Sequence, residues 1–275
     1  MYTQLQQRGS DHPPVTINTL AQMRAHGEKI ACITAYDASF AALVDAAGVD
    51  VVLVGDSLGM VIQGHDTTVP VTMDQMVYHC SAVARGLQHA FLMADLPFAS
   101  YTSRELALAN SVRLMQEGGA RMVKLESGAS QLDIVEYLTS HDIAVCAHLG
   151  LKPQSVHKTG GFRVQGREEQ AAARMLADAR ALEAAGADLL LLECIPAALG
   201  ADITHGVHAP VIGIGAGPDT DGQILVLYDV LDITAGRKPR FVRNFMPEAG
   251  SCSAAVAAYV AAVRGGSYPA PEHCF

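Results

Sequence analysis

The sequence lacks the features that would place the chain in a membrane, on a secretion route or in a disulfide-stabilised class. No apolar run reaches the roughly 18 to 20 residues that a membrane-spanning helix needs. Residues 1–14 are polar and contain no apolar segment typical of a signal peptide. The six cysteines are scattered singly, with no Cys-x-x-Cys pair, and are interpreted as reduced, mostly buried thiols. We therefore expect a cytoplasmic protein.

Positive charge is also scarce. The chain has 19 Lys and Arg residues against 28 Asp and Glu residues, a net charge of −9 and a pI near 5.6. Nucleic acids and anionic membranes attract clusters of Lys and Arg, so the composition argues against both as partners and favours small molecules. Half of the 275 residues are hydrophobic and 17% are charged, which argues against disorder and indicates a packed globule.

Short apolar, β-branched runs alternate with segments that favour helices along the whole chain. The runs are continuously apolar, which is typical of parallel strands that are buried on both faces. Eight such runs in a chain of this length predict an α/β fold, a (β/α)8 barrel; a doubly wound open sheet is the alternative, because periodicity alone does not exclude it. The predicted strands are 30–36, 51–54, 91–94, 122–125, 143–147, 189–192, 211–214 and 224–229, the last of which would also fit a helix.

The barrel is expected to form one domain over residues 1–275. A polar N-terminal arm of about residues 1–28 contains one predicted helix, at 17–25, that could cap the barrel floor. A C-terminal segment of about residues 248–275 carries a small helix and a tail with proline. Neither segment is long enough to be a second domain.

Carboxylates follow three successive strands at their carboxyl ends, where barrels carry their active sites. Asp56 and Asp95 end neighbouring strands, and Glu126 ends the next. An ionised side chain near a core is costly unless it is paired or bound to a metal, and carboxylate oxygens are the ligands that Mg²⁺ prefers. The three residues therefore predict a Mg²⁺ site, although Asp56 could instead cap a helix and Asp95 could form a turn.

Three further polar residues end strands on the same rim. Lys124 is one of only five lysines, and Glu126 or an anionic substrate would stabilise its charge there. Glu193 follows four leucines, where desolvation would raise its pKa and make it a better base near neutral pH, unless an arginine pairs with it. His148 is interpreted either as a hydrogen-bonded structural residue or as a catalyst.

Glycines mark two loops. The run Gly213-Ile-Gly-Ala-Gly217 follows the seventh strand, where barrels commonly bind a phosphate or another anion with backbone N–H groups. Its spacing differs from the Gly-x-Gly-x-x-Gly fingerprint, which argues against a nicotinamide or flavin cofactor. Residues 150–165 are long enough to form a lid after the fifth strand.

Several motifs, in order through roughly residues 17–247, carry a resemblance to a known family. They are Val54-Gly-Asp-Ser-Leu-Gly59, Ala94-Asp-Leu-Pro-Phe98, Val123-Lys-Leu-Glu126, His148-Leu-Gly-Leu-Lys-Pro-Gln154, Gly160-Gly-Phe-Arg-Val-Gln-Gly166, Leu192-Glu-Cys-Ile-Pro196, and Ile212-Gly-Ile-Gly-Ala-Gly217 through Asp221-Gly-Gln223. Together they resemble the ketopantoate hydroxymethyltransferase family. One departure is Ser127, where the family usually has glycine after the Lys-x-Glu triplet; it puts the local backbone conformation in question.

The resemblance implies a Mg²⁺-dependent barrel of the phosphoenolpyruvate/pyruvate superfamily type, assembled as a homo-oligomer, usually a decamer. It implies transfer of a hydroxymethyl group from 5,10-methylenetetrahydrofolate to 3-methyl-2-oxobutanoate, which gives 2-dehydropantoate for pantothenate and coenzyme A. By motif, Glu193 is the base. The metal residues would be Asp56 and Asp95 with Glu126 beside them, and the substrate-binding residues Asp56, Ser57, Asp95 and Lys124.

The chemistry of the residues agrees, because a 2-oxo acid can chelate Mg²⁺ through its carboxylate and ketone oxygens and form a stabilised enolate. Two other functions stay open. A carbon–carbon lyase or mutase of the same superfamily would act on another 2-oxo acid through the same enolate, without folate. A barrel that only binds an anion at residues 213–217 would not exchange a substrate C–H proton.

Overall fold

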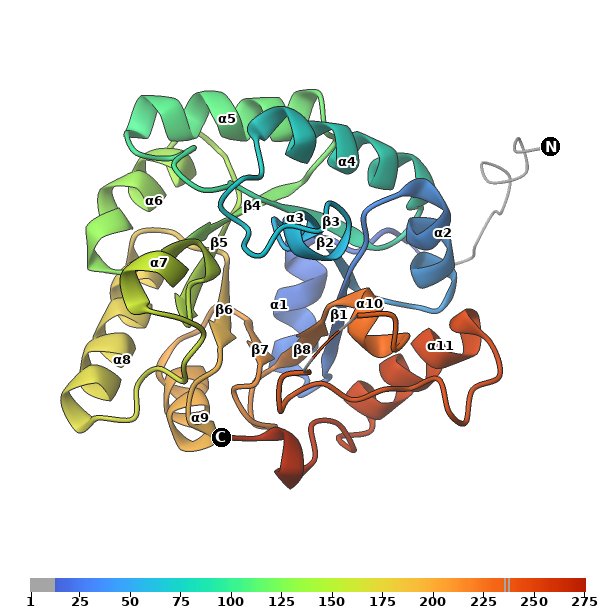
Figure 1. Ribbon diagram of the computed structural model, residues 1–275. Coiled ribbons are helices and arrows are strands. Elements are labelled where there is room, and N and C mark those ends of the chain that lie inside the picture. The colour runs from blue at the N-terminus through green and yellow to red at the C-terminus, as the bar shows by residue number, and fades with distance from the viewer. Residues whose placement is uncertain (1–12, 235, 237) are drawn as a thin grey trace.

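Eight parallel strands close into a barrel in the order of the sequence, and the last strand pairs with the first. The computed structural model describes residues 13–234, 236 and 238–275, so the first part of the predicted arm lies outside the described residues. The closed barrel confirms the predicted fold and excludes the open sheet (Figure 1). The strands are β1 Ile30–Thr34, β2 Val51–Val54, β3 Phe91–Asp95, β4 Met122–Glu126, β5 Val145–Gly150, β6 Leu189–Glu193, β7 Val211–Ile214 and β8 Gly222–Leu225.

β2 and β7 have the predicted bounds, β3, β4 and β6 each extend one residue further, β1 ends at Thr34 instead of residue 36, and β5 and β8 differ more. β5 begins two residues later than predicted and continues to Gly150, so His148 lies within the strand. β8 begins at Gly222, where an added Cβ would lie 2.4 Å from the Ile30 carbonyl oxygen; glycine therefore permits the close approach that joins β8 to β1. The second half of the predicted eighth strand is the short helix α10, Leu227–Val230, and Leu227 N donates to Thr34 Oγ1 at 3.1 Å.

Helices surround the barrel (Figure 1). Their ends follow local capping signals: Ser103 Oγ accepts a hydrogen bond from Leu106 N at the start of α5, and Gly186, with φ of 99°, follows the end of α8. None of the described helices is both long and apolar enough to cross a lipid bilayer. The longer outer helices are α2 Ala38–Ala46, α4 Met73–Gly86, α5 Arg104–Gln116, α6 Leu132–Thr139, α8 Glu169–Ala184, α9 Ala197–Gly206 and α11 Cys252–Arg264. The short helical segments are α3 Leu58–Val61, η2 Ala129–Gln131, η3 Pro153–Ser155, α7 Val156–Thr159 and η4 Pro271–His273.

Helix α1, Ile17–Ala25, has the predicted bounds and closes the floor of the barrel. Leu20 is buried in the same apolar cluster as the inward-facing side chains of the strands, such as Cys32 and Met93. Figure 1 shows α1 within the ring of strands. Because this end is filled, the opposite end, where the strands finish, is the one that is open to ligands.

Helix α11 belongs to the barrel wall, although the sequence suggested only a small helix in a C-terminal tail. Its Tyr259 hydroxyl donates to the Cys32 carbonyl oxygen at 2.7 Å and to the Gln223 carbonyl oxygen at 2.9 Å. These bonds place α11 over the junction of β1 and β8 (Figure 1). The C-terminal segment therefore covers the point at which the barrel closes.

Candidate active site

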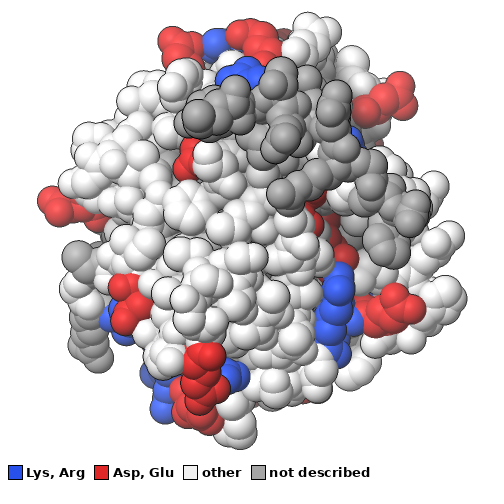
Figure 2. Space-filling view, turned by 90° about the vertical axis from the view of Figure 1, so that its right-hand side faces the viewer, with Lys and Arg blue, Asp and Glu red and all other residues white. Residues whose placement is uncertain are grey.

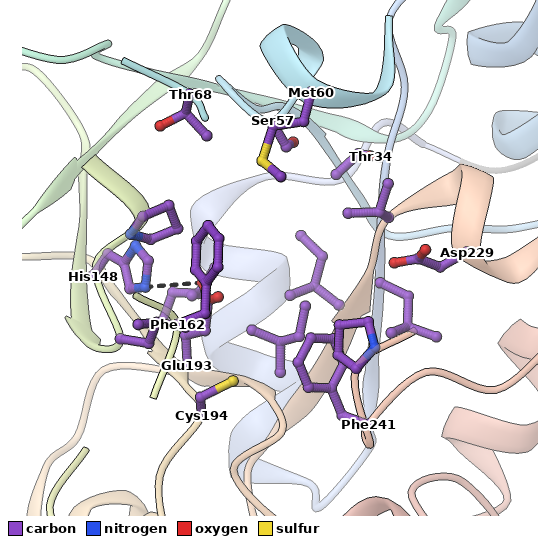
Figure 3. Close-up of a pocket in the computed structure, with 18 of the residues that line it drawn as sticks. Thr34, Ser57, Met60, Thr68, His148, Phe162, Glu193, Cys194, Asp229 and Phe241 are labelled. Carbon is purple, nitrogen blue, oxygen red and sulfur yellow. Dashed lines mark ion pairs between the residues drawn. The ribbon is translucent and has the colours of Figure 1, made fainter. Parts of the chain in front are cut away.

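A cavity of about 720 Å³ opens among the carboxyl ends of the strands (Figure 3). Glu126, in contrast to the other predicted rim residues, lines a neighbouring cavity of about 340 Å³. The barrel therefore brings titratable side chains from five consecutive strands, β2 to β6, to one end of the molecule. The predicted residues that line the larger cavity are Asp56, Ser57, Asp95, Lys124, His148 and Glu193.

The centre of the site is an ion pair between β3 and β4. Lys124 Nζ lies 2.8 Å from Asp95 Oδ1, and both residues are buried. The strand register sets Asp95 directly beside Lys124. Burial alone would lower the pKa of the Lys124 ammonium, but attraction to Asp95 and Asp56 raises it above its usual value. Lys124 is therefore a fixed positive charge in the cavity.

Asp56 follows β2 and is held by contacts with the end of β3 and with η3. Its backbone N–H donates to Asp95 Oδ2 at 3.0 Å, and its Oδ2 accepts from Gln154 Nε2 at 2.8 Å. Gln154 is fixed in turn, because its Nε2 also donates to the Leu96 carbonyl oxygen and its Oε1 accepts from the Tyr101 hydroxyl at 2.6 Å. Burial and the charge of Asp95 raise the pKa of Asp56 well above its usual value.

Glu126 ends β4 and also contacts Gln154, whose backbone N–H donates to Glu126 Oε1 at 2.8 Å. Burial raises the pKa of Glu126 to about 8. The next residue, Ser127, keeps a negative φ, and its Oγ donates to the Leu125 carbonyl oxygen at 2.8 Å. Serine therefore fits the position at which the ketopantoate hydroxymethyltransferase family, which the sequence motifs resemble, usually has glycine.

Glu193 ends β6 and faces the cavity, into which 17% of its side chain is exposed. Burial raises the pKa of Glu193 to about 7, and Lys124 opposes the shift. Within the described part of the chain, the basic side chain beside it is His148, at 3.3 Å between Nε2 and Oε2, and no arginine pairs with it (Figure 3). Burial, with repulsion from Lys124, lowers the pKa of His148 far below its usual value, so the imidazole is neutral.

Ser57 lies at the start of α3, and its Oγ shares a hydrogen bond of 2.9 Å with the Tyr36 hydroxyl. Its position on the cavity wall near Met60 and Thr34 is visible in Figure 3. Ser57 thus presents a hydroxyl to the cavity on the wall formed by β1, β2 and α3.

The two glycine-marked loops form walls of the cavity. Phe162, Arg163 and Val164 line it from the predicted lid segment, where Phe162 is 51% exposed. In the other loop, a Cβ on Gly215 would lie 2.9 Å from the Phe241 ring, and one on Gly217 would lie 2.6 Å from the Ala197 side chain. These glycines let protein side chains pack closely against the loop.

Some lining residues were not predicted from the sequence. Gln154 is contained in one of the quoted motifs, but nothing in its spacing indicates that it joins two carboxylates. Thr34, Asp229, Phe241 and Phe275 come from β1 and from segments after β8, and the fold alone brings them to the cavity. The one feature of the sequence that could have indicated this part of the cavity wall is a polar residue shortly after the last strand, such as Asp229.

The donor set fits Mg²⁺. Among the described residues, no group of three or more His, Cys, Asp and Glu side chains is arranged to hold a metal ion. Mg²⁺, however, commonly binds through one or two carboxylates and completes its coordination with water and substrate. Asp56 and Asp95 are two buried carboxylates that share one ammonium, which leaves negative charge for a cation to offset.

Comparisons with known proteins show the family of the chain. The ketopantoate hydroxymethyltransferase family matches residues 14–271. The chain is 61% identical over 262 residues to a 3-methyl-2-oxobutanoate hydroxymethyltransferase of Alkalilimnicola ehrlichii, with 95% of each chain covered. It is 59% identical to the Marinobacter nauticus protein of the same name, with 95% of this chain and 98% of the relative covered.

Solved structures with this fold are more distant in sequence. A phosphonopyruvate hydrolase has a TM-score of 0.59 at 15% identity, with 77% of this chain and 80% of that chain covered. A 2,3-dimethylmalate lyase, a member of the PEP mutase/isocitrate lyase superfamily, has a TM-score of 0.56 at 17% identity, with 78% and 81% covered. These structures share the barrel. From the family match and its close relatives, this chain belongs to the ketopantoate hydroxymethyltransferase family.

Proposed function

We propose that this chain transfers a hydroxymethyl group from 5,10-methylenetetrahydrofolate to 3-methyl-2-oxobutanoate and so forms 2-dehydropantoate in pantothenate biosynthesis. One observation carries the proposal: a single cavity holds two buried carboxylates, a fixed ammonium and a carboxyl group of raised pKa. These are the groups that enolisation of a 2-oxo acid needs. The names of the close relatives support the same reaction.

Asp56 and Asp95, with Glu126 beside them, would hold Mg²⁺. When bound, this ion would polarise the ketone of the oxo acid and stabilise the negative charge of the enolate. Lys124 places a second positive charge in the cavity, so an anionic substrate binds although the whole chain is acidic. Asp56 and Asp95 would contribute to substrate binding through the metal that they hold. The Ser57 hydroxyl donates a hydrogen bond to the oxo acid.

Glu193 removes the C3 proton of the oxo acid. Its pKa of about 7 gives a large ionised fraction at neutral pH together with enough basicity to accept a carbon-bound proton. The enolate carbon then forms a bond to the one-carbon unit of the folate. The two C–N bonds between this carbon and the folate break, water supplies the hydroxyl oxygen of the product, and the proton taken from C3 and one proton of the water go to the two folate nitrogens as tetrahydrofolate leaves.

We also propose that the chain folds as one domain and assembles as a homo-oligomer, a decamer as the family resemblance implies. The family resemblance supports this assembly. Figure 2 shows that, on the side drawn at right in Figure 1, charged side chains lie mainly toward the margins of the face. Such a face is suited to contact with another subunit.

The decisive experiment is an assay of the purified protein with 3-methyl-2-oxobutanoate, with and without methylenetetrahydrofolate and Mg²⁺. We expect product only when all three are present. Turnover of a 2-oxo acid without folate would favour a lyase or mutase instead. If the protein exchanges no C3 proton with D₂O under any of these conditions, it acts as a binding protein and the proposal fails.

A further inference from the structure

Asp229 is a buried carboxylate that lines the large cavity and takes no part in the proposed enolisation. It lies on α10, the short helix after β8, and is 6% exposed. Figure 3 shows its carboxyl group turned into the cavity, on the side opposite Glu193. Asp229 is therefore available to a ligand that extends away from the site of proton transfer.

Little positive charge offsets this carboxylate. None of the ion pairs among the described residues includes Asp229, and the cation near it, Lys238, pairs with Asp232. Burial raises the pKa of Asp229, and the Thr234 hydroxyl and Lys238 only partly oppose the shift. A carboxylate in such surroundings is costly unless hydrogen-bond donors meet its oxygens.

The walls beside Asp229 are apolar. Ile224, Leu225 and Val226 line the cavity just before it in the chain, and the Phe241 ring lies on the same side of the cavity (Figure 3). The cavity of about 720 Å³ is in the range that holds ligands of drug size, so it has room for much more than a small oxo acid. A flat ligand with adjacent N–H donors along one edge would satisfy both the carboxylate and these walls.

We propose that Asp229 binds the edge of the folate pterin ring that carries N3–H and the 2-amino group. The inference rests on the proposed function, which requires a folate co-substrate. The two donors lie side by side, so each can meet one carboxylate oxygen in a charge-assisted pair. This edge is at the far end of the ring from N5 and C6, so its capture at Asp229 turns the one-carbon unit toward the wall that carries Glu193.

The charges at the mouth of the cavity favour the same orientation. Arg163 and Arg240 line the cavity and are exposed to solvent. Their guanidinium groups match the glutamate carboxylates of the folate tail. With the anionic tail at the mouth, the neutral ring is the part of the folate that enters the interior and reaches Asp229.

The first test is equilibrium binding of tetrahydrofolate to protein loaded with Mg²⁺ and 3-methyl-2-oxobutanoate. For Asp229→Asn we expect the Kd to rise roughly 10- to 100-fold, because one hydrogen bond to a charged group is lost. The matched control is Asp188→Asn, since this half-buried carboxylate accepts a hydrogen bond from Val145 N at the opposite end of the barrel. Its Kd should stay at the wild-type value, and a Kd for Asp229→Asn that is also unchanged would overturn the inference.

The second test uses a tetrahydrofolate analogue without the 2-amino group. Wild-type protein should bind it more weakly than tetrahydrofolate, because the Asp229 oxygen loses its donor, whereas Asp229→Asn should discriminate less. Equal binding of both ligands by wild-type protein would refute the role of Asp229 even if the variant fails to fold.

Exchange of the C3 proton with Mg²⁺ and no folate separates this inference from the proposed function. We expect it to be the same in wild type and Asp229→Asn. If wild-type protein shows no exchange, the proposed function itself is wrong. If exchange is normal and Asp229→Asn binds tetrahydrofolate as wild type does, only the role of Asp229 is wrong.

Discussion

His148 Nε2 lies 3.3 Å from Glu193 Oε2, while its other ring nitrogen, Nδ1, lies 3.4 Å from Lys124 Nζ. An ammonium group has donors and no acceptor, so Nδ1 accepts and the single ring proton is on Nε2, which points toward Glu193. The lowered pKa of His148 keeps the ring in this neutral form. Nε2 lies close to Glu193 without a hydrogen bond to it, so the geometry favours His148 as a neighbour that positions Glu193 over His148 as a base.

Substitution of His148 by leucine should slow C3 proton exchange, because the Glu193 carboxylate loses the imidazole that lies 3.3 Å from it and limits its orientation. Misplacement of a catalytic group can cost up to about 100-fold in rate, which sets the upper limit of the expected loss. His148→Gln keeps a polar side chain beside Glu193 and should retain most of the rate; if both variants behave like wild type in NMR exchange measurements, His148 does not orient Glu193.

Calorimetric titration with Mg²⁺ tests the residues proposed to hold the metal. Gln154→Leu removes the donor to Asp56 Oδ2, and loss of such an outer partner costs roughly 10- to 100-fold in metal affinity. Asp56→Asn and Asp95→Asn each remove a proposed ligand and should lose more, with the fold intact by circular dichroism. The control is Gln116→Leu, at the exposed end of α5. If Asp56→Asn and Asp95→Asn bind Mg²⁺ with wild-type affinity, these residues do not hold the metal.

The residues at the strand ends were predictable because strand period and barrel geometry together determine where they lie. An apolar run that stops at Asp95 or Glu193 places that side chain at the carboxyl end of a buried strand, and all strands of a parallel barrel end on one rim. The prediction needs only the order of residues along each strand. It does not need the path of any loop.

Loop paths are what the sequence left undetermined. Gln154 reaches Asp56 and Glu126 only because η3 turns it back over the rim, and the same turn leaves Glu126 on the neighbouring cavity. Asp229 was expected in a strand because Ile224-Leu-Val-Leu227 is apolar and β-branched in part. A hydrogen bond from Leu227 N to Thr34, distant in sequence, accompanies the helical turn formed instead.

The stability of the metal-free protein should fall as pH rises from 6.5 to 8. Burial raises the pKa of Glu193 from 4.5 to about 7 and that of Glu126 from 4.5 to about 8, so the folded protein retains protons that the unfolded chain has released. Stability then falls with pH by up to about 1.4 kcal/mol per unit for each group. His148 acts in the opposite direction, but only below its unfolded value of 6.5.

Urea unfolding in EDTA across this pH range measures the effect. Glu193→Gln should show a shallower pH dependence than wild type. Added Mg²⁺ should restore stability most at high pH, because its binding displaces the same protons. A free energy of unfolding that rises with pH in EDTA would contradict the assignment of protonated carboxyl groups to the metal-free site.

Oligomerisation can be measured by light scattering coupled to size exclusion. We expect a mass of about ten times the 29.0 kDa of the chain, as the family resemblance implies. The mass should stay constant on dilution through the micromolar range. A value near 29.0 kDa at micromolar concentration would show a monomer and exclude the proposed assembly.

Glu193→Gln tests which residue removes the substrate proton. Glutamine keeps the size of glutamate and a donor or acceptor for His148, but it cannot accept a proton from carbon, so metal and 3-methyl-2-oxobutanoate should still bind. General-base catalysis contributes about 10² to 10⁴ in rate, or roughly 3 to 5 kcal/mol of barrier, and the variant should lose C3 proton exchange with D₂O by that factor. Wild-type exchange needs Mg²⁺ but no folate, because enolisation precedes carbon–carbon bond formation, and its rate should rise with pH around 7 as Glu193 ionises. The measurement is NMR of the C3 proton over time for both proteins. Equal exchange rates would mean that Glu193 is not the base.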